Sequence, residues 1–188
     1  QYTCKDKKGN RIDFRERKGL HEVHTNGFPM TLIDCEVFSK IDVKEFYQNP
    51  LYTKFHGDLQ FDNILYNKET DKFTYIDWRE SFGESTKGGD IYYDLAKLYG
   101  GCIIPYNIMK QDDSIKFSEG DTIVNYSYTN LKSLSKFKST YKNWIISNGY
   151  DLNKIKTLTA LIFLNMSPLH DEKFGKMLWF KCIEILSN

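Results

Sequence analysis

Two acidic segments in the middle of the chain carry residue types suited to phosphoryl transfer. The first is His56-Gly57-Asp58-Leu59-Gln60-Phe61-Asp62-Asn63, and the second is Ile76-Asp77-Trp78. Transfer from a nucleotide needs a carboxylate that orients the attacking hydroxyl group and oxygen ligands that hold Mg²⁺ against the phosphates. We therefore expect Asp58 to act as the base. Asn63 and Asp77 are expected to bind the Mg²⁺ and, through it, the nucleotide.

The elements between these segments must bring them together. Residues 64–66 and 73–76 are two β-prone runs, and the residues between them, Asn67-Lys68-Glu69-Thr70-Asp71, favour turns, so the sequence predicts a β-hairpin. A hairpin returns the chain to its start, which would let Asp77 face Asn63 across one metal ion, with Asp58 beside it. His56 is a second candidate catalytic residue, although we expect it to brace the loop by hydrogen bonds more than to take part in the reaction.

The order of these motifs resembles a known family. Asp58 and Asn63 have the separation found in the kinase catalytic loop H-R-D-x-x-x-x-N. After the hairpin comes Gly89-Asp90-Ile91-Tyr92-Tyr93-Asp94-Leu95-Ala96. Together these motifs resemble the aminoglycoside phosphotransferase and choline kinase superfamily over residues 55–100. More loosely, Trp78-Arg79 together with residues 89–98, which end in Lys97-Leu98, resembles bacterial members associated with capsule or surface-polysaccharide synthesis.

The resemblance implies a fold and a role for two further acids. The fold would be α+β and mostly helical, the C-terminal lobe of a protein-kinase-like fold with a small catalytic β-hairpin. Asp94 would lie beneath the catalytic loop and accept its backbone N–H groups, and Asp90 would cap the following helix. The cofactors would be Mg²⁺ and ATP or another nucleoside triphosphate. The chain departs from the family at Gln60 and Asp62, where His and Gly are usual.

The first 55 residues do not match the other half of such an enzyme. They are polar, with short alternating stretches and one expected helix over residues 37–47, and they contain neither a Gly-rich phosphate loop nor a V-A-I-K strand. We therefore expect residues 1–188 to form a single C-terminal lobe, with residues 1–55 leading into the catalytic part at 56–188. The N-terminal lobe would come from a longer chain or from a partner chain.

The rest of the chain is predicted to be helical. Asp90 should cap a helix carrying Tyr93, Leu95, Ala96 and Leu98, and further helices are expected over residues 126–147, 152–166 and 171–186. Asp171 and Glu172 suit the first turn of the last helix, although an acidic rim that binds an amine is the alternative.

Composition excludes some classes of protein. Lys and Arg number 26 against 25 Asp and Glu, so the chain lacks the overall positive charge that holds nucleic acid. Cys4, Cys35, Cys102 and Cys182 form no C-x-x-C pair, which favours reduced thiols. No apolar run approaches the roughly 18 residues of a membrane span. We expect a cytoplasmic protein with no membrane span.

Two functions follow as expectations. The first is ATP-dependent phosphorylation of a hydroxyl group on a small polar metabolite such as a sugar, an amino alcohol or a choline-like molecule. The second is a catalytically silent kinase-like lobe that serves as a binding or scaffolding module. Aromatic residues including Trp78, Tyr92 and Tyr93 suit either a cage for a quaternary ammonium group or ordinary packing.

Overall fold

The computed structural model describes residues 4–5, 11–12, 22–25, 28–32, 38, 41–42, 44, 50–109, 114–119, 123–129 and 131–188. These residues form an α+β fold, as the sequence predicts. The chain divides into two compact units, each with its own core. The expected helix over residues 37–47 lies for the most part outside the described residues, as does Cys35. Among the described helices, none is both long and apolar enough to cross a membrane.

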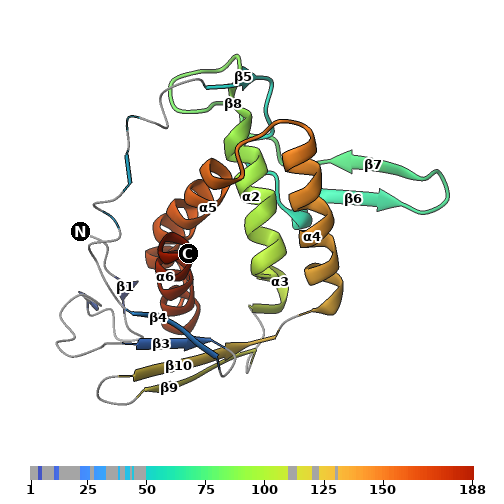
Figure 1. The fold of residues 1–188 in the computed structure, drawn as a ribbon. Helices are drawn as coiled ribbons and strands as arrows, with labels where there is room; N and C mark the ends of the chain where they lie inside the picture. Colours follow the sequence, from blue (N-terminus) through green and yellow to red (C-terminus); the bar gives the residue numbers. More distant parts are fainter. Residues whose placement is uncertain are drawn as a thin grey trace. The chain divides into compact units, whose positions relative to one another are not determined.

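The hairpin unit comprises residues 42–105 and 131–159. Its elements in chain order are β5 (Tyr52–Thr53), the 3₁₀ turn η3 (Phe61–Asn63), β6 (Ile64–Asn67), β7 (Lys72–Tyr75), β8 (Gly89–Asp90), α2 (Ile91–Ile103), α4 (Lys132–Ser147) and the first part of α5 (Leu152–Met166). β6 and β7 pair antiparallel with Ile64 opposite Tyr75, so the predicted hairpin is present. Figure 1 shows this hairpin projecting to one side of α2 and α4.

Helix α2 is the centre of the hairpin unit. Asp90 is its N-cap and accepts a hydrogen bond from the Tyr92 N–H at 3.1 Å, which satisfies a backbone donor at the helix start. Two polar side chains hold neighbouring helices to the backbone of α2. The Tyr141 hydroxyl of α4 donates to Leu95 O at 3.2 Å, and the Thr159 hydroxyl of α5 donates to Ala96 O at 3.0 Å.

The sheet unit comprises residues 1–41, 106–130 and 160–188. It contains β1 (Cys4–Lys5), β2 (Arg11–Ile12), β3 (Glu22–Thr25), β4 (Phe28–Leu32), α3 (Tyr106–Met109), β9 (Ile115–Glu119), β10 (Ile123–Tyr128), the end of α5, η4 (Ser167–Leu169) and α6 (Glu172–Ser187). Four of its strands form one mixed sheet in the order β4-β3-β10-β9, in which β3 and β10 are parallel.

The sheet corrects one prediction. Residues 126–128, expected at the start of a helix, end strand β10, and the helix begins only at Lys132. The physical reason is the two-residue alternation of β10, since Val124 and Tyr126 are buried while Asn125 between them is exposed. The helices expected over residues 152–166 and 171–186 are present as α5 and α6. Asp171 is the N-cap of α6 and accepts from the Phe174 N–H at 3.1 Å.

Candidate functional site

The hairpin brings the two acidic segments of the sequence together. Beyond the paired strands, the Ile76 N–H donates to Asn63 O at 3.1 Å, and the Arg79 N–H donates to His56 O at 2.8 Å. Asp77 lies between these two anchored residues. The chain that leaves the hairpin is therefore bonded back onto the loop that enters it, at both ends of the stretch containing Asp77.

Asp94 fixes the start of this loop from below. Its carboxylate accepts the His56 N–H at 2.6 Å and the Gly57 N–H at 2.8 Å, and its side chain is buried. These are the contacts that the family resemblance implies for Asp94. Hydrogen bonds from backbone N–H groups to an ionised carboxylate are among the stronger ones in proteins, so the loop is held to α2 at a defined point.

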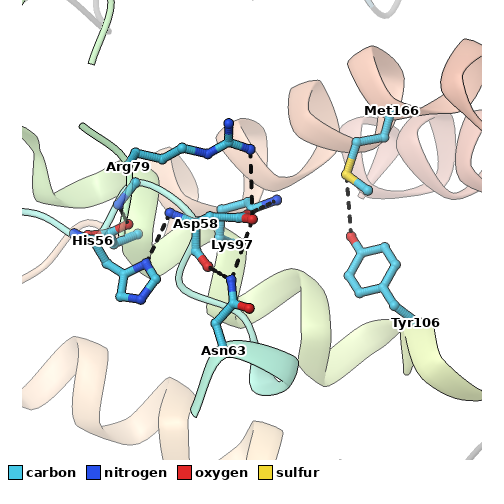
Figure 2. A network of polar contacts seen from close by, with 9 residues as sticks. His56, Asp58, Asn63, Arg79, Lys97, Tyr106 and Met166 are labelled. Carbon is cyan, nitrogen blue, oxygen red and sulfur yellow. Dashed lines mark hydrogen bonds and ion pairs between the residues drawn. The ribbon is translucent and has the colours of Figure 1, made fainter. Parts of the chain in front are cut away.

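Asp58 is buried and surrounded by donors. Lys97 of α2 places Nζ 2.7 Å from Asp58 Oδ1, and the two side chains are only 10% and 11% exposed. Arg79 places Nη2 3.9 Å from Oδ2. The Asn63 amide donates to Asp58 O at 2.9 Å and approaches Oδ2 at 3.5 Å. Figure 2 shows Arg79 and Asn63 reaching Asp58 from opposite sides in that view.

His56 supports the loop. Its Nδ1 accepts the Asp58 N–H at 3.3 Å, and its ring stacks on Trp78 with centroids 4.7 Å apart. Because Nδ1 is the acceptor, the proton of the neutral ring belongs on Nε2. Nε2 is buried and has no hydrogen-bond partner among the described residues. The Trp78 ring therefore packs against His56 on one face. The Tyr92 ring lies beneath a cation of the protein itself, with Lys154 Nζ 4.2 Å from its centroid. Both rings thus have packing partners within the protein.

Asn63 and Asp77 are chemically suited to hold Mg²⁺. The Asn63 amide directs its NH₂ group at Asp58 O, so the carbonyl oxygen of the same planar group points the other way and is the atom that could bind a cation. Asp77 is exposed and has φ +61°, a left-handed conformation that costs a non-glycine residue of order 1 kcal/mol. No group of three or more His, Cys, Asp or Glu side chains suited to a metal occurs in the described ranges. Mg²⁺ bound with a nucleotide commonly uses only one or two protein ligands.

Two cations at the site, Lys97 and Arg79, were not predicted from the sequence, because their partner Asp58 is remote along the chain. A signal for Lys97 existed. Asp94 and Lys97 are three residues apart on α2, so they share a face of the helix, and a helix face that binds the loop through Asp94 presents Lys97 to the same loop. Asp62, the additional acid next to Asn63, is exposed.

Comparison of the chain with family models, with curated proteins and with solved structures finds no match. The membership suggested by the motifs of residues 55–100 therefore stays a prediction.

Proposed function

We propose that this chain is the catalytic lobe of an ATP-dependent phosphotransferase that phosphorylates a hydroxyl group of a small polar metabolite. The observation that carries the proposal is the pair of backbone hydrogen bonds at Ile76 and Arg79, which hold Asp77 against the loop of Asp58 and Asn63. A carboxylate base and two oxygen ligands thus come from two segments joined by one hairpin. Sugars, amino alcohols and choline-like molecules are the acceptors to be considered, and a cytoplasmic location is part of the proposal.

Each residue has a distinct role in this reaction. Asp58 accepts the hydrogen bond of the acceptor hydroxyl and orients its oxygen for attack, and Lys97 and Asn63 fix the position of the carboxylate. Asn63 and Asp77 would hold Mg²⁺, which when bound offsets the negative charge of the nucleotide phosphates. Asp94 and His56 keep the loop in one conformation.

The proposal includes the C-terminal lobe of a protein-kinase-like fold. The order of loop, hairpin and capped helix α2 supports it. Several apolar side chains of the hairpin unit are exposed, among them Leu65, Phe73 and Trp78. A nucleotide-binding N-terminal lobe, from a longer chain or a partner chain, would cover such side chains, since large exposed apolar patches mark binding surfaces.

The second candidate is a catalytically silent lobe that binds a partner. The observation that favours it is the contact between Lys97 Nζ and Asp58 Oδ1 at 2.7 Å, because it occupies one of the two oxygens on which the reaction depends. Binding of ATP and turnover of an acceptor separate the two candidates.

A matched pair of aspartates tests the proposal. Asp71 and Asp77 are the two non-glycine residues with positive φ in the described part of the chain, at +52° and +61°. Asparagine tolerates this conformation as well as aspartate, so Asp77→Asn and Asp71→Asn disturb the backbone equally little. Calorimetry on the full-length protein measures Mg²⁺-dependent ATP binding. Asp77→Asn should weaken this binding at least about tenfold, and Asp71→Asn should leave it unchanged, because of these two aspartates only Asp77 is a proposed metal ligand.

The readouts distinguish the candidates. Release of ADP with one acceptor of the three classes, reduced in Asp77→Asn, supports the phosphotransferase. ATP binding without turnover of any acceptor supports the silent lobe. If the unsubstituted full-length protein binds no ATP with Mg²⁺, or if Asp71→Asn and Asp77→Asn behave alike, the proposed site is contradicted.

A further inference from the structure

Arg79 has a side chain whose stem is fixed by the loop. Its own N–H is bonded to His56 O, and the stem crosses directly over Gly57, which has φ +82°. A Cβ atom on Gly57 would lie 2.5 Å from Arg79 Cβ and 2.6 Å from Arg79 Cγ, far inside van der Waals contact. Only glycine at position 57 lets the stem follow this path, so the direction of the Arg79 side chain is set by the loop itself.

The charged end of Arg79 is, in contrast, largely unused. The side chain is 65% exposed, and Nη2 lies 3.9 Å from Asp58 Oδ2, beyond hydrogen-bond range. Across the described residues this long contact is the one ion pair of the guanidinium group. A guanidinium group carries five donors in a planar fork that matches the two oxygens of a carboxylate or phosphate.

Lys97 and Arg79 differ in their distance from Asp58. Lys97 Nζ lies 2.7 Å from Oδ1, whereas Arg79 Nη2 stays 3.9 Å from Oδ2, so the guanidinium group makes no close ion pair among the described residues. Tyr93 lies in the field of the same groups. Burial raises the pKa of its hydroxyl, the charge of Asp58 raises the pKa further, and Arg79 opposes the rise. The Tyr93 hydroxyl therefore keeps its proton at neutral pH and remains a hydrogen-bond donor.

We propose that Arg79 binds an oxyanion beside Asp58, a phosphate or carboxylate group carried by one of the two reactants. This inference rests on the proposed function. The oxyanion has two sources, the terminal phosphate of the nucleotide and an anionic substituent on the acceptor. In either case the fixed stem and free head of Arg79 would align that reactant with the carboxylate that orients the hydroxyl.

Inorganic phosphate is the probe. It is titrated by calorimetry into the full-length protein and into Arg79→Gln, Arg79→Lys and Lys68→Gln. Lys68 lies exposed in the hairpin turn, so its substitution removes the same charge away from Asp58. Arg79→Gln should weaken phosphate binding at least about tenfold, since charge-assisted hydrogen bonds are lost, and Arg79→Lys should weaken it less. Lys68→Gln should bind as the unsubstituted protein does.

Two results would overturn the inference. One is phosphate binding that is equal in Arg79→Gln and Lys68→Gln, and the other is no phosphate binding by the unsubstituted protein. Urea unfolding of Arg79→Gln checks that the fold is kept, and a matching midpoint is expected because the substituted group is mostly exposed.

ADP and a non-hydrolysable ATP analogue, each with Mg²⁺, identify the source. If Arg79→Gln weakens binding of the ATP analogue but not of ADP, Arg79 binds the terminal phosphate. If it loses phosphate and leaves both nucleotides unchanged, the acceptor carries the anion. Failure of the proposed function has a different signature, because the unsubstituted protein would then bind neither nucleotide with Mg²⁺ while the phosphate result could still depend on Arg79.

Discussion

The two units each bury a lysine against an acid, but the two pairs differ in what surrounds them. In the sheet unit, Lys181 Nζ lies 2.6 Å from Glu184 Oε2, one turn along the same helix. The Tyr126 hydroxyl donates to the same carboxylate at 3.1 Å, and Lys181 Nζ lies 5.8 Å and 5.3 Å from the ring centres of Tyr126 and Tyr128. The rings of Tyr126 and Tyr128 lie beside this pair, which is formed within one helix.

The pair in the hairpin unit joins distant segments. Lys97 belongs to α2 and Asp58 to the loop before the hairpin, and a second, exposed cation lies near the same carboxylate, with Arg79 Nη2 3.9 Å from Oδ2. The loop is also held by Asp94, so several interactions position this one acid. A buried ion pair stabilises a fold only marginally compared with apolar packing. The Asp58 pair therefore differs from the Glu184 pair in joining distant segments and in having an exposed second cation near its carboxylate.

The largest expected effect comes from neutralising the acid of each pair and comparing the two variants. Asp58→Asn and Glu184→Gln each leave a buried lysine without its counter-charge, so each should lower the free energy of unfolding, by about 3 kcal/mol. Only Asp58→Asn should also reduce turnover, by roughly a hundredfold or more, the scale of a lost general base. Urea unfolding and ADP release measure the two quantities. A loss of turnover in Glu184→Gln that matches Asp58→Asn would show that stability alone explains the effect.

The contrast also explains what the sequence could predict. The hairpin, the Asp90 cap and helices α5 and α6 follow from local patterns of turn formers, capping residues and apolar spacing. The contacts of Asp94 are those that the family resemblance implied, and no local pattern predicts them. Arg79 could not be predicted because an ion pair between distant segments leaves no local pattern, whereas the three-residue spacing of Asp94 and Lys97 on α2 was a signal for Lys97. For residues 126–128, the two-residue alternation of β10 was a local signal for a strand, whereas its pairing with β3 is remote in the sequence.

A smaller effect tests how strongly the loop constrains the Arg79 stem beside the Asp58 pair. Gly57 and Gly149 both have positive φ, at +82° and +76°, but a Cβ atom on Gly149 would meet nothing within 4 Å. Gly149→Ala should therefore cost only the left-handed conformation, about 1 kcal/mol. Gly57→Ala adds the clash with Arg79 and should cost about 3 kcal/mol in total.

Urea unfolding of the two glycine variants gives the difference. Phosphate titration adds a second readout, because displacement of the Arg79 stem should weaken phosphate binding in Gly57→Ala alone. Equal losses of stability in the two variants would mean that the contact between Gly57 and the Arg79 stem does not constrain the loop.

The last prediction concerns two thiols on the same helices as the two lysines. Cys102 is on α2 with Lys97, and Cys182 follows Lys181 on α6; both are buried. Burial raises the pKa of each thiol to about 12, from 9.0. In a variant with Cys4→Ser and Cys35→Ser, alkylation by iodoacetamide at pH 8 should be at least about a hundredfold slower in the folded protein than in urea, since the thiolate is the reactive form.

The pH dependence of stability has a definite sign. The folded protein keeps both thiol protons above pH 9, where the unfolded chain loses them, so this contribution to the free energy of unfolding is complete below pH 9 and is lost as the pH rises toward 12. Urea unfolding at pH 8 and pH 10 measures this contribution, and Cys102→Ala or Cys182→Ala should each reduce the loss of stability between the two pH values.

The labelling rates of the two thiols also compare the two units. Equal labelling rates would mean that the two units unfold locally equally often. Faster labelling of Cys102 would mean that the hairpin unit, whose Lys97–Asp58 pair joins distant segments, unfolds locally more often than the sheet unit, whose Lys181–Glu184 pair lies within one helix.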